Sequence, residues 1–225
     1  MSWYNSVVYD ESYTTELGER IMRMLALSWF WLRWGILGLC WGLFALVWLV
    51  GALYNALKSP AVQKRSGPLS WVVGIAAFII IDQFVPSSFW RLLTFDTLWL
   101  RMIGIACLLL ATAFTLWARW VLGKMWSFSA VARTGHQLHI DGPYRITRHP
   151  IYTGMLGMLL GTMLMSGLGR YTALLLLGIV LLEIKLHQEE RLLTEIFGEE
   201  YVQYKRYVPQ LIPGLRWRKG RTQVA

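Results

Sequence analysis

The chain has 225 residues; 56% are hydrophobic, 14% aromatic and only 16% charged, and the mean hydropathy is +0.43. Soluble domains are about 45–50% apolar and about 25% charged, so this composition excludes an intrinsically disordered chain, and two cysteines are too few for a disulfide scaffold. The formal net charge of +9 comes from 22 basic and 13 acidic residues, and their positions matter more than their sum.

The first predicted element is an amphipathic helix that precedes the long apolar blocks. Leu17, Ile21, Met24 and Leu25 recur at helical spacing, and acidic and basic residues occupy the rest of the helix surface. A helix with one apolar stripe and a charged remainder is typical of segments that lie on a membrane. We therefore interpret this segment as a surface helix.

Further along the chain, the apolar residues form five blocks that contain no charged residue. A helix of ~20 residues spans the ~30 Å hydrocarbon core of a bilayer; the first and fourth blocks reach that length, the third nearly does, and the second and fifth are short. A soluble domain of this size cannot bury five such helices. We predict an all-α, polytopic transmembrane helical bundle of about five spans with a cytosolic C-terminal helical extension. The blocks are residues 34–53, 69–81, 102–118, 150–169 and 171–182.

Tryptophans and basic residues orient these blocks. Most of the 13 tryptophans lie near block ends, where an indole ring meets the headgroups. Basic residues concentrate in the first and third connections and in the tail after residue 182, which share one side in a five-span chain; Arg91 and Arg101, in the second connection, are evidence against this assignment. The positive-inside rule then predicts an N-terminus outside and a cytoplasmic C-terminus, in the plasma (inner) membrane of a prokaryote or the endoplasmic reticulum of a eukaryote.

We predict one integral-membrane domain over residues 1–225. Its N-terminal part, residues 1–121, holds the surface helix and three spans, and residues 122–225 hold the last two spans with most of the polar chemistry. The basic tail is expected to contact anionic lipid headgroups rather than nucleic acid. The protein is expected to be a monomer.

The first polar segment is residues 136–152, which read HQLHIDGPYRITRHPIY. Pro150 suits the first position of a helix, and a helix start binds carboxylates or phosphates through free N–H groups and the positive end of its dipole. Arg145 and Arg148 add positive charge beside it. The expected free N–H groups belong to Ile151, Tyr152 and Thr153.

The second polar segment is residues 183–204, which continue the fifth span as a helix. Lys185 and Glu189 are four residues apart and share a face, and Glu189 and Glu190 are successive acids just above the membrane. The predicted topology brings the two segments together, so a carboxylate faces an anion-binding helix start. That pair matches a zwitterionic, sugar-bearing small molecule. All four histidines of the chain lie in the two segments: His136, His139, His149 and His187.

Simpler interpretations remain open for these polar residues. Arginine and histidine at a span boundary often face lipid headgroups, and acids on a helix extension are often solvated. The histidines show neither an HxxxH nor an HxH spacing, and Cys40 and Cys107 lie inside apolar blocks, so we predict no metal site.

Three motifs in the C-terminal half resemble those of a known family. GPYRITRHPIYTG, at residues 142–154, resembles the G-x-Y-x-x-x-R-H-P-x-Y-x-G signature of the isoprenylcysteine carboxyl methyltransferase family. Glu189-Glu190 followed by FGEEYVQYKRYVPQLIP, and LGKMWS at residues 122–127, also resemble that family. The spans before residue 122 share only hydropathy with it. The wider group includes phospholipid N-methyltransferases and small-molecule thiol methyltransferases.

The resemblance implies an integral-membrane, S-adenosyl-L-methionine-dependent methyltransferase without a Rossmann domain. It implies a cofactor pocket at the cytosolic ends of the last spans and a lipophilic acceptor that enters from the bilayer. His139 departs from the family, which has an aliphatic residue there. The cofactor contacts implied by the resemblance are His136, Gln137, Leu138, His139, Tyr144, His149, Pro150, Ile151, Tyr152 and Glu189.

The residue chemistry suits this cofactor and suggests catalytic roles. The helix start suits its carboxylate, Glu189 its ribose or ammonium, and the rings of Tyr144 or Tyr152 its sulfonium. Transfer would be an in-line displacement governed by alignment. Arg148 or Lys185 is the candidate for holding an anionic acceptor, and the resemblance gives Lys185 a substrate-side place.

The acceptor and two other functions stay open from sequence alone. An isoprenylcysteine carboxylate needs no general base, whereas a phospholipid amine or small thiol would be helped by His139 or His187. One alternative is an NADPH-dependent membrane reductase of the steroid-reductase type. Another is a non-enzymatic scaffold or transporter, although charges are nearly absent from the middle of the spans.

Overall fold

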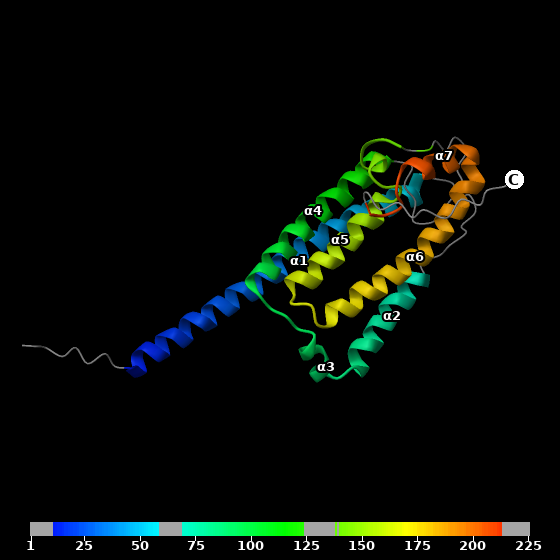
Figure 1. Ribbon diagram of the computed structural model, residues 1–225. Helices are drawn as coiled ribbons and strands as arrows, with labels where there is room; N and C mark the ends of the chain where they lie inside the picture. Colours follow the sequence, from blue (N-terminus) through cyan, green and yellow to red (C-terminus); the bar gives the residue numbers. More distant parts are fainter. Residues whose placement is uncertain (1–10, 59–68, 124–137, 139, 213–225) are drawn as a thin grey trace, which may run out of the picture. The chain divides into compact units, whose positions relative to one another are not determined.

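The computed structural model describes residues 11–58, 69–123, 138 and 140–212 (Figure 1). These residues contain no strand, only one isolated bridge between Thr94 and Leu168, which confirms the all-α prediction. The elements are α1 (Glu11–Lys58), α2 (Leu69–Phe84), α3 (Ser87–Leu92), α4 (Leu98–Leu122), the short 3-10 helix η2 (Gly142–Arg145), α5 (Pro150–Met165), α6 (Arg170–Phe197) and α7 (Glu199–Tyr207).

The apolar helices identify an integral membrane protein. Three are long and apolar enough to cross a bilayer, namely Glu16–Tyr54 of α1, α4 and α6; α2 and α5 are apolar but have only 16 residues each. Large apolar side chains also point outward, such as Leu110 at 72% exposure and Trp120 at 81%. Exposure of such large apolar side chains to water is energetically unfavourable, whereas contact with lipid tails is not.

Helix α1 differs from the sequence prediction, because the expected surface helix and the first span form one helix of 48 residues. No proline interrupts residues 11–58, so nothing in the sequence ends the helix between the two parts. The structure divides within α1 into two compact units, Met1–Leu39 and Cys40–Ala225. The surface location of residues 17–25 stays a prediction, and the candidate site lies in the second unit.

The interior of the second unit is the tightly packed pair of α4 and α5. A Cβ built on Gly161 would lie 2.5 Å from the backbone nitrogen of Leu108, and one on Gly104 would lie 2.3 Å from that of Met165. Small residues let membrane helices approach this closely. Because the hydrophobic effect does not drive helices together inside lipid, van der Waals packing of this kind stabilises the pair instead. Trp41 joins the pair by donating a hydrogen bond from Nε1 to Thr162 Oγ1 at 3.1 Å.

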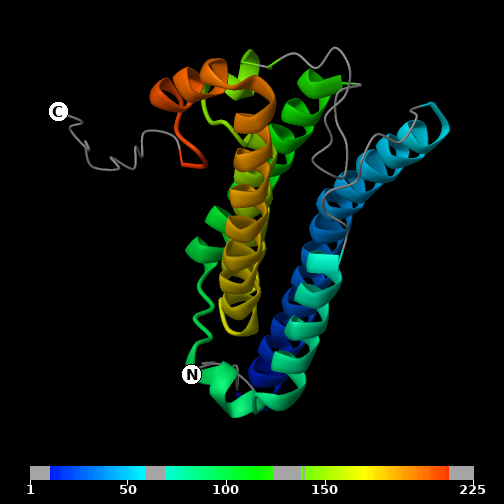
Figure 2. The ribbon, with the colours of Figure 1, turned by 90° about the vertical axis from the view of Figure 1, so that its right-hand side faces the viewer.

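A tight turn between α5 and α6 decides where the polar segments lie. Gly167, Leu168 and Gly169 all have positive φ, and the turn pairs with the segment before α4 through Phe95 N–H to the Gly167 carbonyl at 3.1 Å. The turn sends α6 back along α5, and Figure 2 shows α6 running from it to α7 at the other end. The start of α5 and the far end of α6 therefore meet, as the sequence predicted.

Candidate active site

The site begins with the loop that leads into α5. Gly142 begins η2 with a positive φ of +58. Tyr144 and Thr147, which follow it in the loop, are buried. His149 follows and is only 6% exposed. Pro150 then takes the first helical position, where its missing N–H costs nothing.

The segment after α7 holds this loop in place. Arg148 N–H donates to the Pro209 carbonyl at 2.9 Å, and His149 N–H donates to the Gln210 carbonyl at 3.2 Å. The Thr147 hydroxyl also donates to the Gln210 carbonyl, at 2.8 Å. The Thr153 hydroxyl donates to the Leu211 carbonyl at 2.7 Å. We call residues 208–211 the C-terminal clasp, because their carbonyls satisfy donors about 60 residues earlier in the chain.

Helix α5 itself uses one of the backbone donors that the sequence predicted to be free. Thr153 N–H donates to the His149 carbonyl at 3.0 Å as the first bond of α5, so the prediction that it is free is wrong. The reason is that helical bonding begins one residue earlier than a proline start suggests. Ile151 and Tyr152 stay the predicted backbone donors.

Two neighbouring carboxylates of α6 flank the His149 ring. Its Nδ1 lies 3.9 Å from Glu189 Oε2, and its Nε2 lies 3.4 Å from Glu190 Oε1. Glu190 Oε1 also pairs with Arg148 Nη2 at 2.6 Å, and Glu190 Oε2 pairs with Lys205 Nζ of α7 at 3.1 Å. The site therefore concentrates acids and bases from the loop, α6 and α7 in a partly buried cluster.

Tyrosines form the walls of this cluster. The Tyr152 ring stacks on His149 with centroids 5.9 Å apart, and the Tyr204 hydroxyl donates to the Tyr144 carbonyl at 2.6 Å. Tyr201 is 1% exposed. Burial raises the pKa of the Tyr144, Tyr201 and Tyr204 hydroxyls above the ordinary value, so these phenols stay protonated and can donate hydrogen bonds.

Three buried polar atoms of the site have no hydrogen-bond partner among the described residues: Glu189 Oε2, His149 Nε2 and the Tyr201 hydroxyl. Buried polar atoms are nearly always paired, and an unpaired one is unfavourable by about 1–3 kcal/mol. These atoms belong to the loop before α5, to α6 and to α7. The arrangement is suited to a polar ligand that offers both donors and acceptors.

The structure brings most of the sequence-predicted site residues together. Tyr144, Arg148, His149, Pro150, Ile151, Tyr152 and Glu189 lie in the loop, at the start of α5 or on the facing part of α6. Lys185 is 7% exposed on α6, one turn before Glu189. Leu138 is half-buried, and His136, Gln137 and His139 lie outside the described residues.

One predicted residue stands apart, and others were missed. The His187 side chain is 70% exposed, and its Nδ1 lies 2.8 Å from the Glu183 carbonyl of its own helix, so it does not join the cluster. Glu190, Tyr201, Lys205 and the C-terminal clasp were not predicted as site components. Pro209 was the available signal for the C-terminal clasp, because a proline there ends the preceding helix and leaves the carbonyls that follow without helical partners.

The helical bundle and its polar end can now be compared with known proteins. A family model described as Phospholipid methyltransferase matches residues 99–200, which hold α4, the loop, α5 and α6. The Protein-S-isoprenylcysteine O-methyltransferase of Schizosaccharomyces pombe is 38% identical over 81 residues, which are 35% of this chain and 34% of that enzyme. The Protein-S-isoprenylcysteine O-methyltransferase B of Arabidopsis thaliana is 28% identical over 170 residues, 72% of this chain and 81% of that enzyme.

A solved structure has the same fold. It is that of the eukaryotic intramembrane Ras methyltransferase, an isoprenylcysteine carboxyl methyltransferase; the TM-score is 0.53 at 22% identity, over 82% of this chain and 68% of that chain. These findings make the chain similar, in sequence and in fold, to integral-membrane methyltransferases. Within that class it is similar to the isoprenylcysteine carboxyl methyltransferase-like family, which confirms the resemblance carried by its motifs.

Proposed function

We propose that the protein transfers a methyl group from S-adenosyl-L-methionine to the carboxylate of a lipophilic, isoprenylcysteine-type acceptor. The observation that carries the proposal is the buried His149 ring, held between Glu189 and Glu190 at the start of α5. The match to the yeast relative covers only 34% of that enzyme, so the donor and acceptor are argued from this chain's own residues.

The donor set fits this methyl donor. Glu189 Oε2 is buried and makes no hydrogen bond among the described residues, so it can accept from a ribose hydroxyl or an ammonium. The first N–H groups of α5, on Ile151 and Tyr152, suit a carboxylate. Tyr152, stacked on His149, and Tyr144 offer ring faces to a sulfonium. His136, Gln137, Leu138, His139 and Pro150 complete the proposed contacts.

The acceptor would be bound on the membrane side of these groups. Lys185 lies one turn closer to the bilayer than Glu189 on the same face of α6, and its burial suits it to hold an acceptor carboxylate. Bound methyl donor supplies an electrophilic methyl carbon, to which the acceptor oxygen bonds as the carbon–sulfur bond breaks. An ionised carboxylate needs no base, which agrees with the outward location of His187.

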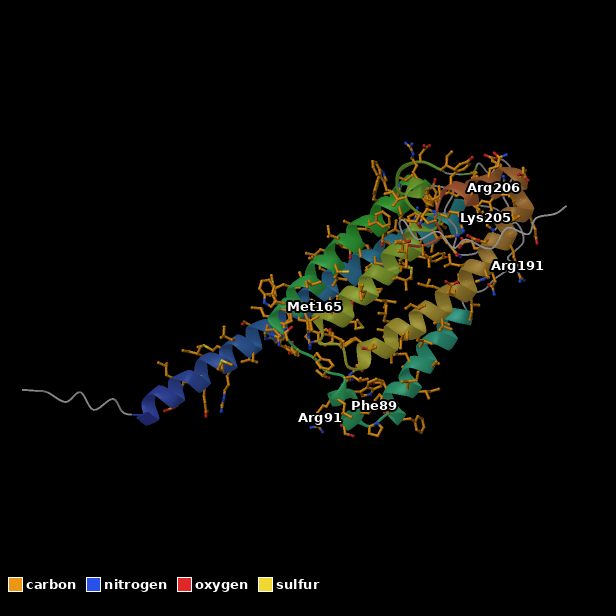
Figure 3. The ribbon with its side chains drawn as sticks, viewed as in Figure 1. Phe89, Arg91, Met165, Arg191, Lys205 and Arg206 are labelled. Atoms are coloured by element: carbon orange, nitrogen blue, oxygen red, sulfur yellow. The ribbon has the colours of Figure 1, made fainter. Side chains whose placement is uncertain are left out.

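The orientation is proposed from charge. Figure 3 shows Arg191, Lys205 and Arg206 at the α7 end and Arg91 at the opposite end. The larger group of basic residues favours a cytoplasmic α7 and C-terminus, with the N-terminus outside, in a plasma or endoplasmic reticulum membrane. A monomer in lipid suffices for the proposed chemistry, and no nucleic acid is involved.

The first experiment is a calorimetric titration of the purified protein with S-adenosylhomocysteine. We expect binding that weakens at least about tenfold in Glu189→Ala and His149→Ala, because each removes a buried contact. Gln188→Ala is the matched control, since Gln188 is the exposed neighbour of Glu189 on α6. Absence of binding by the unaltered protein, or binding of NADPH in its place, would refute the methyltransferase proposal and favour a reductase.

The second experiment identifies the acceptor. A labelled-methyl assay compares an isoprenylated cysteine with a free carboxylate, a phospholipid with a primary amine and a small thiol, followed by mass spectrometry of the product. We expect label only on the carboxylate. Transfer to the amine or thiol alone would contradict the proposed acceptor while leaving the methyltransferase class intact.

A further inference from the structure

The Arg148 guanidinium is already engaged inside the protein. Its side chain is 8% exposed. Nε and Nη2 donate to Glu190 Oε1 at 2.9 and 2.6 Å, and Nη1 donates to the carbonyls of Val208 at 2.7 Å and Lys205 at 3.3 Å. These four bonds use most of the five N–H groups that an arginine has.

Glu190 is engaged to the same degree, unlike its neighbour. Its Oε1 pairs with Arg148 Nη2 and lies 3.4 Å from His149 Nε2. Its Oε2 pairs with Lys205 Nζ at 3.1 Å. Glu189 Oε2, by contrast, is buried without a hydrogen-bond partner in the described part of the chain. Two successive acids of α6 therefore have different surroundings. Glu190 contacts Arg148, Lys205 and His149, whereas Glu189 Oε2 makes no hydrogen bond among the described residues.

The connected groups join three distant parts of the chain. Arg148 precedes His149 in the loop, Glu190 follows Glu189 on α6, and Lys205 lies on α7 just before the C-terminal clasp. The clasp also binds the backbone of residues 148 and 149. These contacts therefore connect α6 and α7 to the loop that carries His149 and leads into α5.

We propose that Arg148, Glu190 and Lys205 are positioning residues, which we call the charge triad, and that Arg148 does not hold the acceptor. This rests on the proposed function and deepens it, because it assigns Arg148 to the donor side of the site. An acceptor carboxylate could reach Arg148 only by displacing Glu190 and two carbonyls, each of which would lose a buried partner. The triad instead fixes the surfaces that bind the methyl donor.

Lys205 gives the cleanest test, because it is the most exposed member of the charge triad, at 35%, and its loss leaves the Arg148–Glu190 pair intact. In Lys205→Met we expect the Kd for S-adenosylhomocysteine to rise about tenfold, with the KM for the isoprenylated cysteine within about twofold. Lys205→Arg should restore donor binding, because it keeps the cation. Arg206→Met, the exposed neighbour, is the matched control and should behave as the unaltered protein.

Arg148→Lys tests the second half of the proposal. Lysine keeps the charge but cannot bond Glu190 and two carbonyls at once, so donor binding should weaken about ten- to a hundredfold while the acceptor KM changes little. A raised acceptor KM with unchanged donor affinity would overturn the proposal. Should this variant fail to fold, the Lys205 pair decides: equal donor affinity in Lys205→Met and Arg206→Met would overturn it. Failure of the proposed function itself is distinct, because the unaltered protein would then bind no S-adenosylhomocysteine.

Discussion

The α4–α5 interface and the charge triad are both tightly constrained, but by different forces. Between α4 and α5, glycines such as Gly161 bring backbones together, and α5 itself contains no charged residue. At the charge triad, Arg148, Glu190 and Lys205 satisfy one another in a place where water is largely excluded. In lipid, then, steric fit holds the spans together, whereas paired charges hold the site at their end.

The largest expected effect comes from breaking the triad at its centre. Glu190→Ala leaves Arg148 buried without its carboxylate, and removing one partner of a buried ion pair is unfavourable by about 3–5 kcal/mol. Thermal unfolding in detergent should show a large decrease in melting temperature. Glu190→Gln keeps the shape and some hydrogen bonds and should lie in between; no difference between the two variants would contradict the electrostatic argument.

The next largest effect is expected from a substitution that disturbs the steric fit between α4 and α5. The Cβ of Gly161→Ala would lie 2.5 Å from the Leu108 nitrogen and 2.8 Å from its Cα, and backbone cannot yield as a flexible side chain does. Overpacking of this kind is unfavourable by about 1–3 kcal/mol, which unfolding should reveal. Gly42→Ala is the control, since its Cβ would meet nothing within 4 Å. Equal stability of the two variants would refute the packing model.

A smaller effect concerns the contact between α7 and the loop. Tyr204→Phe removes the 2.6 Å hydrogen bond to the Tyr144 carbonyl, and a lost bond of this kind is unfavourable by about 0.5–1.5 kcal/mol. Because burial raises the pKa of the Tyr204 hydroxyl well above the ordinary value of about 10, the unaltered protein should keep this donor at about pH 11, and the difference should be the same as at pH 7. A difference that vanishes at about pH 11 would show that the phenol ionises normally.

The smallest expected effect lies in the first compact unit. Glu16 and Arg20 form a surface ion pair at 2.9 Å with side chains 63% and 72% exposed. Such i, i+4 pairs stabilise a helix by only about 0.2–0.5 kcal/mol and are screened by salt. Glu16→Gln should therefore leave the melting temperature nearly unchanged, and a shift as large as that of Tyr204→Phe would mean that the pair is less solvated than its exposure indicates.

Much of the fold follows from local sequence. Apolar blocks of about 12–20 residues can only be helices in a bilayer, since every backbone group must find its partner within the segment. Gly167 and Gly169 mark the turn that returns α6 along α5, so the meeting of the two polar segments could be predicted. The length of α1 could not, because no residue between its two parts signals an end.

The motifs around His149 and Glu189 predicted a methyltransferase-like function and the main candidate site residues from the sequence alone. Tertiary structure decided the division of roles among them. Adjacent residues of a helix point about 100° apart, so only the packing of α7 and the C-terminal clasp shows that Glu190 is tied to Arg148 and Lys205 while Glu189 is not. The same geometry turns His187 outward, because sequence gives a side chain's spacing along a helix but not its neighbours on other helices.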